Sequence, residues 1–269
     1  MNLLKWGSMM GILTLLLTGC GGCGGGGNSP TEPDQTPPAI SNSSITPSAE
    51  RALVYWETDK PATSQVNYGP SMAAIREQKK TDETYVEEHV VHLSALNPDK
   101  TYYLMISSTD QSGNANEPQI LSFTTSHSAL VMSPLLVDVK RKETFTIEIR
   151  AENVTNLFGT AFDLKFDSDY LEVDEVDEEG IVFGDFLENP LTFNMLTGNI
   201  LSIATTQTNS GAGMKGVSGS GLLVTVPFKA KKAGNTQLNL TISQMLDSNG
   251  ESHPDLNQIR IVGGKVNIR

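Results

Sequence analysis

Apolar and polar residues alternate in short runs along most of the chain after residue 37. Alternation with a period of two is typical of β-strands that bury one face. The clearest run is Thr144 to Arg150, in which Phe145, Ile147 and Ile149 fall on one face. No stretch after residue 37 keeps the period of an amphipathic helix. The pattern therefore predicts an all-β protein.

The first group of runs lies within residues 37–126 and predicts a β-sandwich domain. Turn residues such as Gly69-Pro70 and the stretch Asp110 to Asn114 separate the runs. The predicted strands of this domain are Ala52–Trp56, Ser64–Tyr68, His89–Leu93, Tyr102–Ile106 and Ile120–Thr124.

The second group lies within residues 128–269 and predicts a second, nine-stranded β-sandwich. Gly-Asn and Asn-Gly pairs mark turns between its runs. In the run from Phe158 to Asp167, alternation places Phe162 and Leu164 in the core. The predicted strands include Leu135–Val139, Thr144–Arg150, Phe158–Asp167, Asn199–Thr206, Leu222–Ala230, Thr236–Ile242 and Gly264–Ile268.

The N-terminus predicts an export signal. Lys5 precedes an apolar run of about a dozen residues, which is too short to span a bilayer core of ~30 Å but suits a signal peptide. The run ends in Leu17-Thr18-Gly19-Cys20, which resembles the bacterial lipobox. This resemblance implies removal of residues 1–19 and attachment of lipid to Cys20. An ordinary secretory peptide or a buried helix is the alternative interpretation.

Residues 20–36 predict a flexible tether, because they are rich in glycine and then in proline. Cys20-x-x-Cys23 could also be a redox or metal pair, but two ligands alone make a poor site. A lipid anchor followed by a tether predicts a protein held at the cell surface or the outer membrane.

Charge and composition narrow the functional classes. The chain has 19 Lys and Arg against 31 Asp and Glu, a formal net charge of -12, which argues against nucleic-acid binding. Its four histidines are scattered, and neither metal-ligand spacing nor a Gly-x-Ser-x-Gly motif accompanies them. We therefore predict that the protein is not an enzyme and holds no metal or cofactor.

The first domain resembles a bacterial fibronectin type III module in Trp56–Gly69 and Leu96–Tyr103. This resemblance implies that Trp56 packs in the core and that Tyr102 forms a tyrosine corner by bonding back to the backbone. His89 and His92 are three apart on one strand, so they should point to opposite faces and not share a metal ion.

The second domain resembles a cohesin, the receptor module for dockerin modules in cellulosome-type assemblies. The blocks that carry the resemblance are Leu157–Val173, Gly198–Ala204, Gly221–Ala230 and Gly263–Ile268. It implies a protein that binds a dockerin-bearing partner without covalent chemistry. Calcium would then belong to the loops of the partner.

The resemblance also implies which residues meet the partner. The binding face would use strands near residues 159–165, 199–206, 222–228 and 236–242. Leu201 and Ile203 could instead be core residues, with Ile200, Ser202 and Ala204 outside. Many cohesins have Asn and Asp where this chain has Gly159 and Ala161, so its partner specificity should differ. The residues expected to contact the partner are Gly159, Ala161, Asp163, Lys165, Leu201 and Ile203.

Two acidic segments of the second domain could have a catalytic or calcium-binding role. The acidic residues between Asp167 and Glu179 could serve hydrolysis or calcium binding, but a solvated strand end and loop explains them more simply. Asp247 to Glu251 is similar to a calcium loop but lacks its further acid, so we predict a turn.

Carbohydrate binding is the alternative function, with polysaccharide as the ligand. Modules that stack sugars usually present tryptophan, whereas the second domain has none and has Tyr170 as its one tyrosine. A stacking surface there would have to use phenylalanine. Our favoured expectation is a surface lipoprotein that docks a dockerin-bearing protein, with a role in polysaccharide breakdown.

Overall fold

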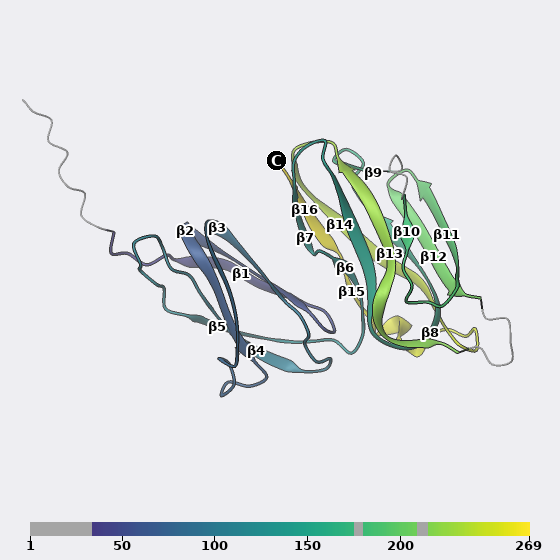
Figure 1. The fold of residues 1–269 in the computed structure, drawn as a ribbon, viewed down its shortest axis with the longest axis horizontal. Coiled ribbons are helices and arrows are strands. Elements are labelled where there is room, and N and C mark those ends of the chain that lie inside the picture. The colour runs from purple at the N-terminus through teal and green to yellow at the C-terminus, as the bar shows by residue number, and fades with distance from the viewer. Residues whose placement is uncertain (1–33, 175–179, 209–214) are drawn as a thin grey trace, which may run out of the picture. The chain divides into compact units, whose positions relative to one another are not determined.

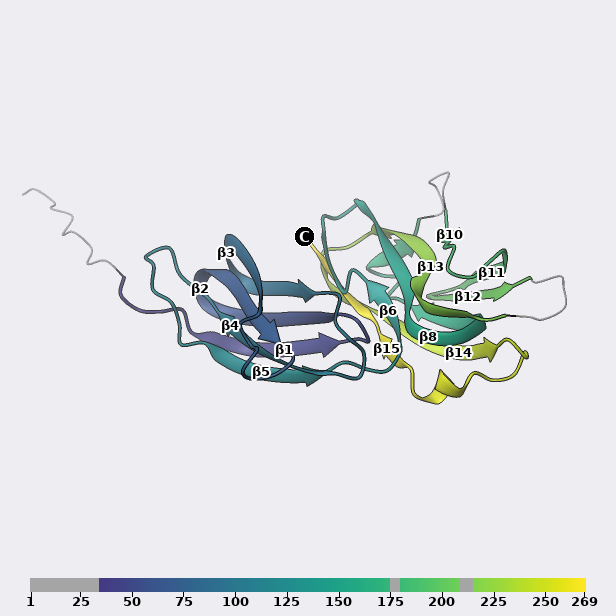
Figure 2. The ribbon, with the colours of Figure 1, turned by 60° about the horizontal axis from the view of Figure 1, so that its bottom comes forward.

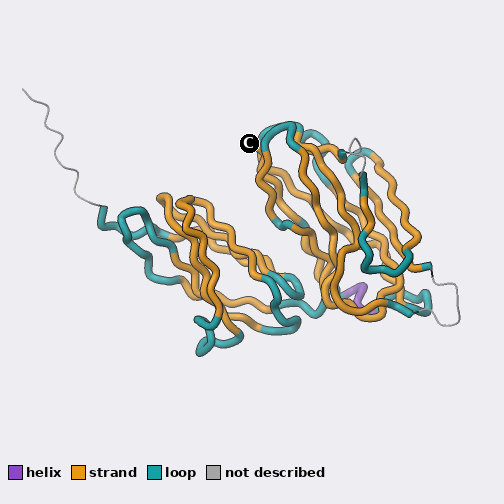
Figure 3. Tube along the Cα trace, viewed as in Figure 1, coloured by secondary structure: helices purple, strands orange, loops and turns teal. Residues whose placement is uncertain are grey.

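The computed structural model describes residues 34–174, 180–208 and 215–269, of which Gln35–Arg269 forms one compact unit. Cys20, the expected signal peptide and most of the tether lie outside the described residues. The described part is built almost wholly of strands, and its single helix is the one-turn η1 (Pro254–Asn257), purple in Figure 3. No helix in these ranges is long and apolar enough to cross a membrane.

A long strand, β2, organises the first domain. Residues 52–58 of β2 pair with β1, and residues 65–69 pair with β4. Strand β2 spans two of the predicted strands, Ala52–Trp56 and Ser64–Tyr68, and its pairing with β3 shifts register between Glu57 and Ala62. The strands, shown in Figure 1, are β1 (Ile40–Pro47), β2 (Ala52–Gly69), β3 (Gln78–Leu93), β4 (Thr101–Ser107) and β5 (Gln119–Thr124).

The core of the first domain contains the aromatic residues that the sequence predicts. Trp56 is fully buried, and its Nε1 donates a hydrogen bond to Ser108 Oγ at 2.9 Å. Tyr102 is buried, and its hydroxyl oxygen accepts from the backbone N–H of Asn97 at 2.9 Å. The predicted corner bond of Tyr102 is therefore confirmed.

The two histidines of β3 point to opposite faces, as predicted. His89 is fully buried, stacks on Trp56 with ring centroids 4.8 Å apart, and lies 2.8 Å from the hydroxyls of both Thr58 and Ser64. Burial lowers the pKa of His89 to about 4. His92 is exposed. The ring of His89 is thus a neutral, hydrogen-bonded core group at neutral pH.

The second domain is a β-sandwich, as predicted, and its sheets are jelly-roll-like. Its described residues form eleven strands, two more than the nine that the sequence predicts. The strands are β6 (Ala129–Ser133), β7 (Leu136–Val139), β8 (Thr144–Lys165), β9 (Leu171–Val173), β10 (Val182–Phe183), β11 (Pro190–Thr197), β12 (Ile200–Gln207), β13 (Val217–Ala230), β14 (Gly234–Asp247), β15 (Arg260–Val262) and β16 (Gly264–Ile268).

Strand β8 takes part in both layers of this sandwich. Its first half pairs with β6 and β13, whereas residues 159–165 pair with β12 and β14. Asn153 and Asn156, both with positive φ, lie between the halves. Left-handed backbone is a conformation that asparagine tolerates, so these residues let the strand change direction. Figure 2 shows the resulting curve of β8.

Apolar side chains from both layers fill the space between them. Ile147 of β8 and Phe228 of β13 come from one layer, and Phe162 and Leu164 of the other half of β8 come from the second. All four are fully buried. The inward assignment of Phe162 and Leu164 from the sequence is confirmed.

Candidate partner-binding face

The outer face of one layer collects most of the residues expected to bind a partner. This layer runs β14–β8–β12–β11, and we call its solvent side the open face. Because side chains alternate along each strand, every second residue of these four strands belongs to the open face.

Strand β8 contributes Gly159, Ala161, Asp163 and Lys165 to the open face, as predicted. Asp163 is half-buried and accepts a hydrogen bond from Ser202 Oγ of β12 at 2.7 Å. The Asp163 carboxylate thus has a fixed position near the middle of the face.

At Gly159 the strand has no room for a side chain. A Cβ there would lie 2.8 Å from Thr206 Oγ1 and 2.9 Å from Thr206 Cβ. Thr206 therefore fills the space that an asparagine would need at this position.

The prediction that Leu201 and Ile203 contact the partner is wrong. Both are essentially fully buried, because they lie directly opposite Leu164 and Phe162 of β8, and directly opposed residues share one face. The alternative, with Ile200, Ser202 and Ala204 on the outside, is the observed arrangement. The buried residues of β12 are Leu201, Ile203, Thr205 and Gln207.

The expected contribution of residues 222–228 is also wrong. These residues belong to β13, which pairs with the first half of β8 and with β9, not with residues 159–165. They lie in the opposite layer, so they cannot extend the open face.

Strand β11 takes that place and was missed by the sequence reasoning. It pairs antiparallel with β12 through the turn at Gly198-Asn199 and forms the edge beyond β12 (Figure 2). Leu191, Phe193 and Met195 lie opposite outward residues of β12, and 64%, 56% and 52% of their surfaces are exposed. We call these three residues the apolar row. Their alternation with Thr192 and Asn194 was a strand signal available in the sequence.

Strand β14 gives the other edge a polar character. Its outward residues include Asn239 and Thr241, opposite Lys165 and Asp163. The open face is therefore polar around Asn239, Thr241, Asp163 and Lys165 and apolar along β11.

Comparison with known protein families identifies the second domain. Residues 135–268 match the family model for the cohesin domain. The second domain is a cohesin domain. No curated protein matches the chain.

Solved cohesin structures resemble about half of the chain. A non-cellulosomal cohesin from the archaeon Archaeoglobus fulgidus is 18% identical, with a TM-score of 0.43 over 54% of this chain and 92% of that one. A type I cohesin–dockerin complex from Clostridium thermocellum is 17% identical, with a TM-score of 0.44 over 54% of this chain and 100% of that one. A type II cohesin–X–dockerin complex from Acetivibrio cellulolyticus is 16% identical, with a TM-score of 0.44 over 53% of this chain and 99% of that one.

The acidic segments of the cohesin domain are structural where they are described. Asp167 Oδ1 accepts from the backbone N–H of Asp169 at 2.9 Å. Asp247 Oδ1 accepts from the N–H groups of Asn249 and Glu251, which makes the predicted turn. Residues 175–179 lie outside the described ranges. Within those ranges, no group of three or more His, Cys, Asp or Glu side chains could hold a metal ion.

Proposed function

We propose that the cohesin domain binds a dockerin-bearing protein non-covalently through the open face. The apolar row carries this proposal: three large apolar side chains lie exposed along one edge of a sheet face whose other strands carry the polar groups Asp163, Lys165, Ser202 and Thr241. Contiguous exposed apolar groups with a polar surround are typical of protein-binding surfaces. The family match to cohesins supports a protein partner, and we propose no catalytic role.

The arrangement suits a helical partner. Leu191, Phe193 and Met195 would pack against the apolar side of a dockerin helix, since a helix can lay such a side against an apolar strip. Asp163 and Lys165 would hydrogen-bond its polar flank. With Gly159 and Ala161 in place of Asn and Asp, apolar contact supplies more of the binding free energy, and calcium stays in the partner.

Isothermal titration of the full chain with a panel of calcium-loaded dockerins tests the proposal. We expect one dockerin to bind, and chelation of calcium to abolish binding. Phe193→Ser should weaken binding at least about tenfold, as loss of an aromatic anchor does. Ile120→Ser in the first domain is the matched control, because 52% of Ile120 is exposed, against 56% of Phe193. Failure of the whole panel to bind, or equal loss in both variants, would overturn the proposal.

We further propose that the protein is a lipoprotein of the cell surface or outer membrane, anchored through Cys20, with the first domain as a fibronectin type III-like module. The lipobox-like sequence and the Gly/Pro-rich tether support this. Detergent-phase partitioning of cells expressing the chain should place it with membrane proteins. Cys20→Ala should move it to the aqueous phase, whereas Cys23→Ala should not.

Carbohydrate binding is the second candidate, and Phe193 is the observation that favours it. An exposed aromatic ring on a sheet face can stack on a sugar. A glycan array probed with the full chain separates the two proposals: retention of a polysaccharide, lost in Phe193→Ser, would favour the carbohydrate function. We propose a role in polysaccharide breakdown only on the resemblance to cellulosome-type assemblies, and either partner is compatible with it.

A further inference from the structure

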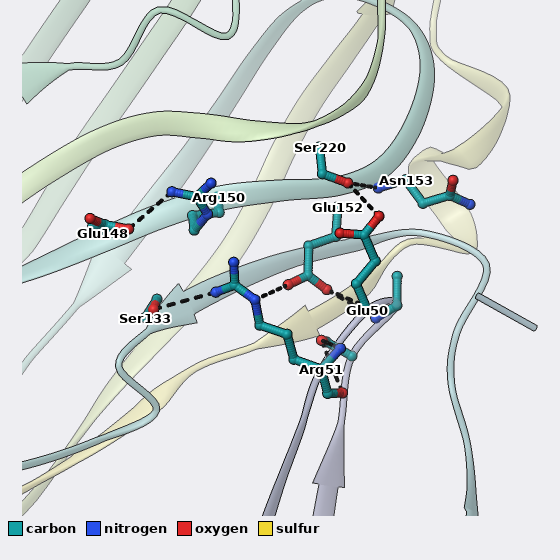
Figure 4. Close-up of polar contacts among 10 residues, drawn as sticks. Glu50, Arg51, Ser133, Glu148, Arg150, Glu152, Asn153 and Ser220 are labelled. Carbon is teal, nitrogen blue, oxygen red and sulfur yellow. Dashed lines mark hydrogen bonds and ion pairs between the residues drawn. The ribbon is translucent and has the colours of Figure 1, made fainter. Parts of the chain in front are cut away.

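A buried carboxylate on the cohesin domain is held by the first domain. Glu152 of β8 has 1% of its side chain exposed. Its Oε2 accepts from the backbone N–H groups of Ala49 and Glu50 at 3.1 Å each, and its Oε1 lies 3.3 Å from Arg51 Nε (Figure 4). These three groups belong to the turn between β1 and β2.

Further polar contacts surround this carboxylate and involve two more strands. Ser220 Oγ of β13 donates to Glu50 Oε1 at 2.7 Å and accepts from the N–H of Asn153 at 2.9 Å. Arg51 Nη1 donates to Ser133 Oγ of β6 at 3.4 Å. The turn therefore contacts β6, β8 and β13, as Figure 4 shows.

An apolar contact accompanies the polar ones. Val131, Leu135 and Val262 form a small buried cluster of the cohesin domain, separate from its main core, and Leu53 of β2 packs against it. Leu53 follows the polar turn by two residues, so one short segment supplies both kinds of contact.

A buried carboxylate is costly without donors, and removing one partner of a buried ion pair is strongly destabilising. Glu152 receives an ion pair and two backbone N–H bonds from a segment about one hundred positions earlier in the chain. Separation of the domains would remove these contacts together.

We infer that the surface around Glu152 is a docking site for the Ser48–Leu53 segment, and that this contact joins the first domain and the cohesin domain into one rigid unit. The first domain is then a structural partner that fixes the orientation of the open face. The inference is independent of what the open face binds.

NMR spin relaxation of the backbone amides in the full chain tests this inference, because it gives the rotational correlation time of each domain. In the native chain the two correlation times should be equal, and the Ala49 and Glu50 amides should be protected from hydrogen exchange. In Glu152→Ala the correlation times should differ and shorten, and these amides should exchange at least about tenfold faster, since local opening sets exchange.

Glu148→Ala is the matched control, because Glu148 lies on the same strand, four residues earlier, and pairs with Arg150 of its own domain. It should keep one common correlation time. Should Glu152→Ala fail to fold, Arg51→Ala decides, since 34% of the Arg51 side chain is exposed and its loss leaves both cores intact. Unequal correlation times in the native chain, or equal ones in the folded Glu152→Ala or Arg51→Ala variant, would overturn the inference.

Discussion

The two faces of the β14–β8–β12–β11 layer come from alternate residues of the same strands but differ in chemistry. Phe162 and Leu201, on the inner face, are fully buried. Asp163 and Ser202, their neighbours in sequence, lie on the open face and bond to each other. Inner residues therefore set the stability of the domain, and outer residues are available to a partner. Strand β3 repeats the contrast with His89 inside and His92 outside.

The largest expected effect follows from the inner position of Leu201. Leu201→Ala should lower the free energy of unfolding by about 2–5 kcal/mol, because it leaves a cavity in a packed core. Urea unfolding measures this. Ala204→Ser, three positions along on the open face, should change stability by less than about 0.5 kcal/mol. Similar losses in the two variants would break the contrast between the faces.

A pH-dependent loss is expected from the inner histidine of β3. The pKa of His89 falls to about 4 on folding, so the unfolded chain binds a proton first as the pH decreases. Stability should be complete above the unfolded pKa of about 6.5 and should fall by up to about 3 kcal/mol as the pH drops to about 4.

Unfolding followed across this pH range, with the His89 ring resonances titrated alongside, measures the effect. His89→Gln should remove this part of the pH dependence, and His92→Gln on the outer face should retain it. A His89 ring that titrates near pH 6.5 in the folded chain would contradict the prediction.

A smaller effect is expected at Gly159, where the open face has no space. Gly159→Asn, which restores the residue common in cohesins, should cost about 1–3 kcal/mol through overpacking against Thr206. Adding Thr206→Gly should recover part of the loss, so a double-mutant cycle of unfolding free energies measures the coupling. Additive effects would show that Thr206 does not occupy the asparagine's space.

The smallest effect on stability is expected from Asp163→Asn. The asparagine oxygen can still accept from Ser202, so unfolding should change by less than about 0.5 kcal/mol. Binding of the proposed dockerin partner should weaken by about tenfold, because a charged group at the face is lost. Glu172→Gln in the opposite layer makes the same charge change and is the control. It should leave the affinity for the dockerin, measured by calorimetry, unaltered. If Glu172→Gln weakened binding as much as Asp163→Asn, Asp163 would not be a partner contact.

The predictability of the site differed from strand to strand. On β8, apolar and polar residues alternate from Phe162 to Phe166, so the outward positions of Asp163 and Lys165 followed from the pattern, and that of Ala161 followed by extending it. On β12, Ile200, Leu201 and Ile203 are apolar on both faces, and alternation could not choose between them. Pairing of Leu201 with Leu164 made the choice. On β11, Leu191, Phe193 and Met195 face outward, contrary to the usual pattern of a strand that buries one face, while Leu196 lies opposite Leu201 on the other side and is itself 41% exposed.

By itself the sequence pattern determined the all-β class, the approximate place of most strands and the core position of Phe162, which depend on alternation and turns within a few residues. The resemblance to a fibronectin type III module supplied the core position of Trp56 and the corner bond of Tyr102. Only the tertiary structure decided that β11 flanks β12 with its apolar row outward, and that Glu152 meets the turn at Ala49 and Glu50. The physical reason is that register and burial arise from pairs of segments distant in the chain, which a local period of two cannot specify.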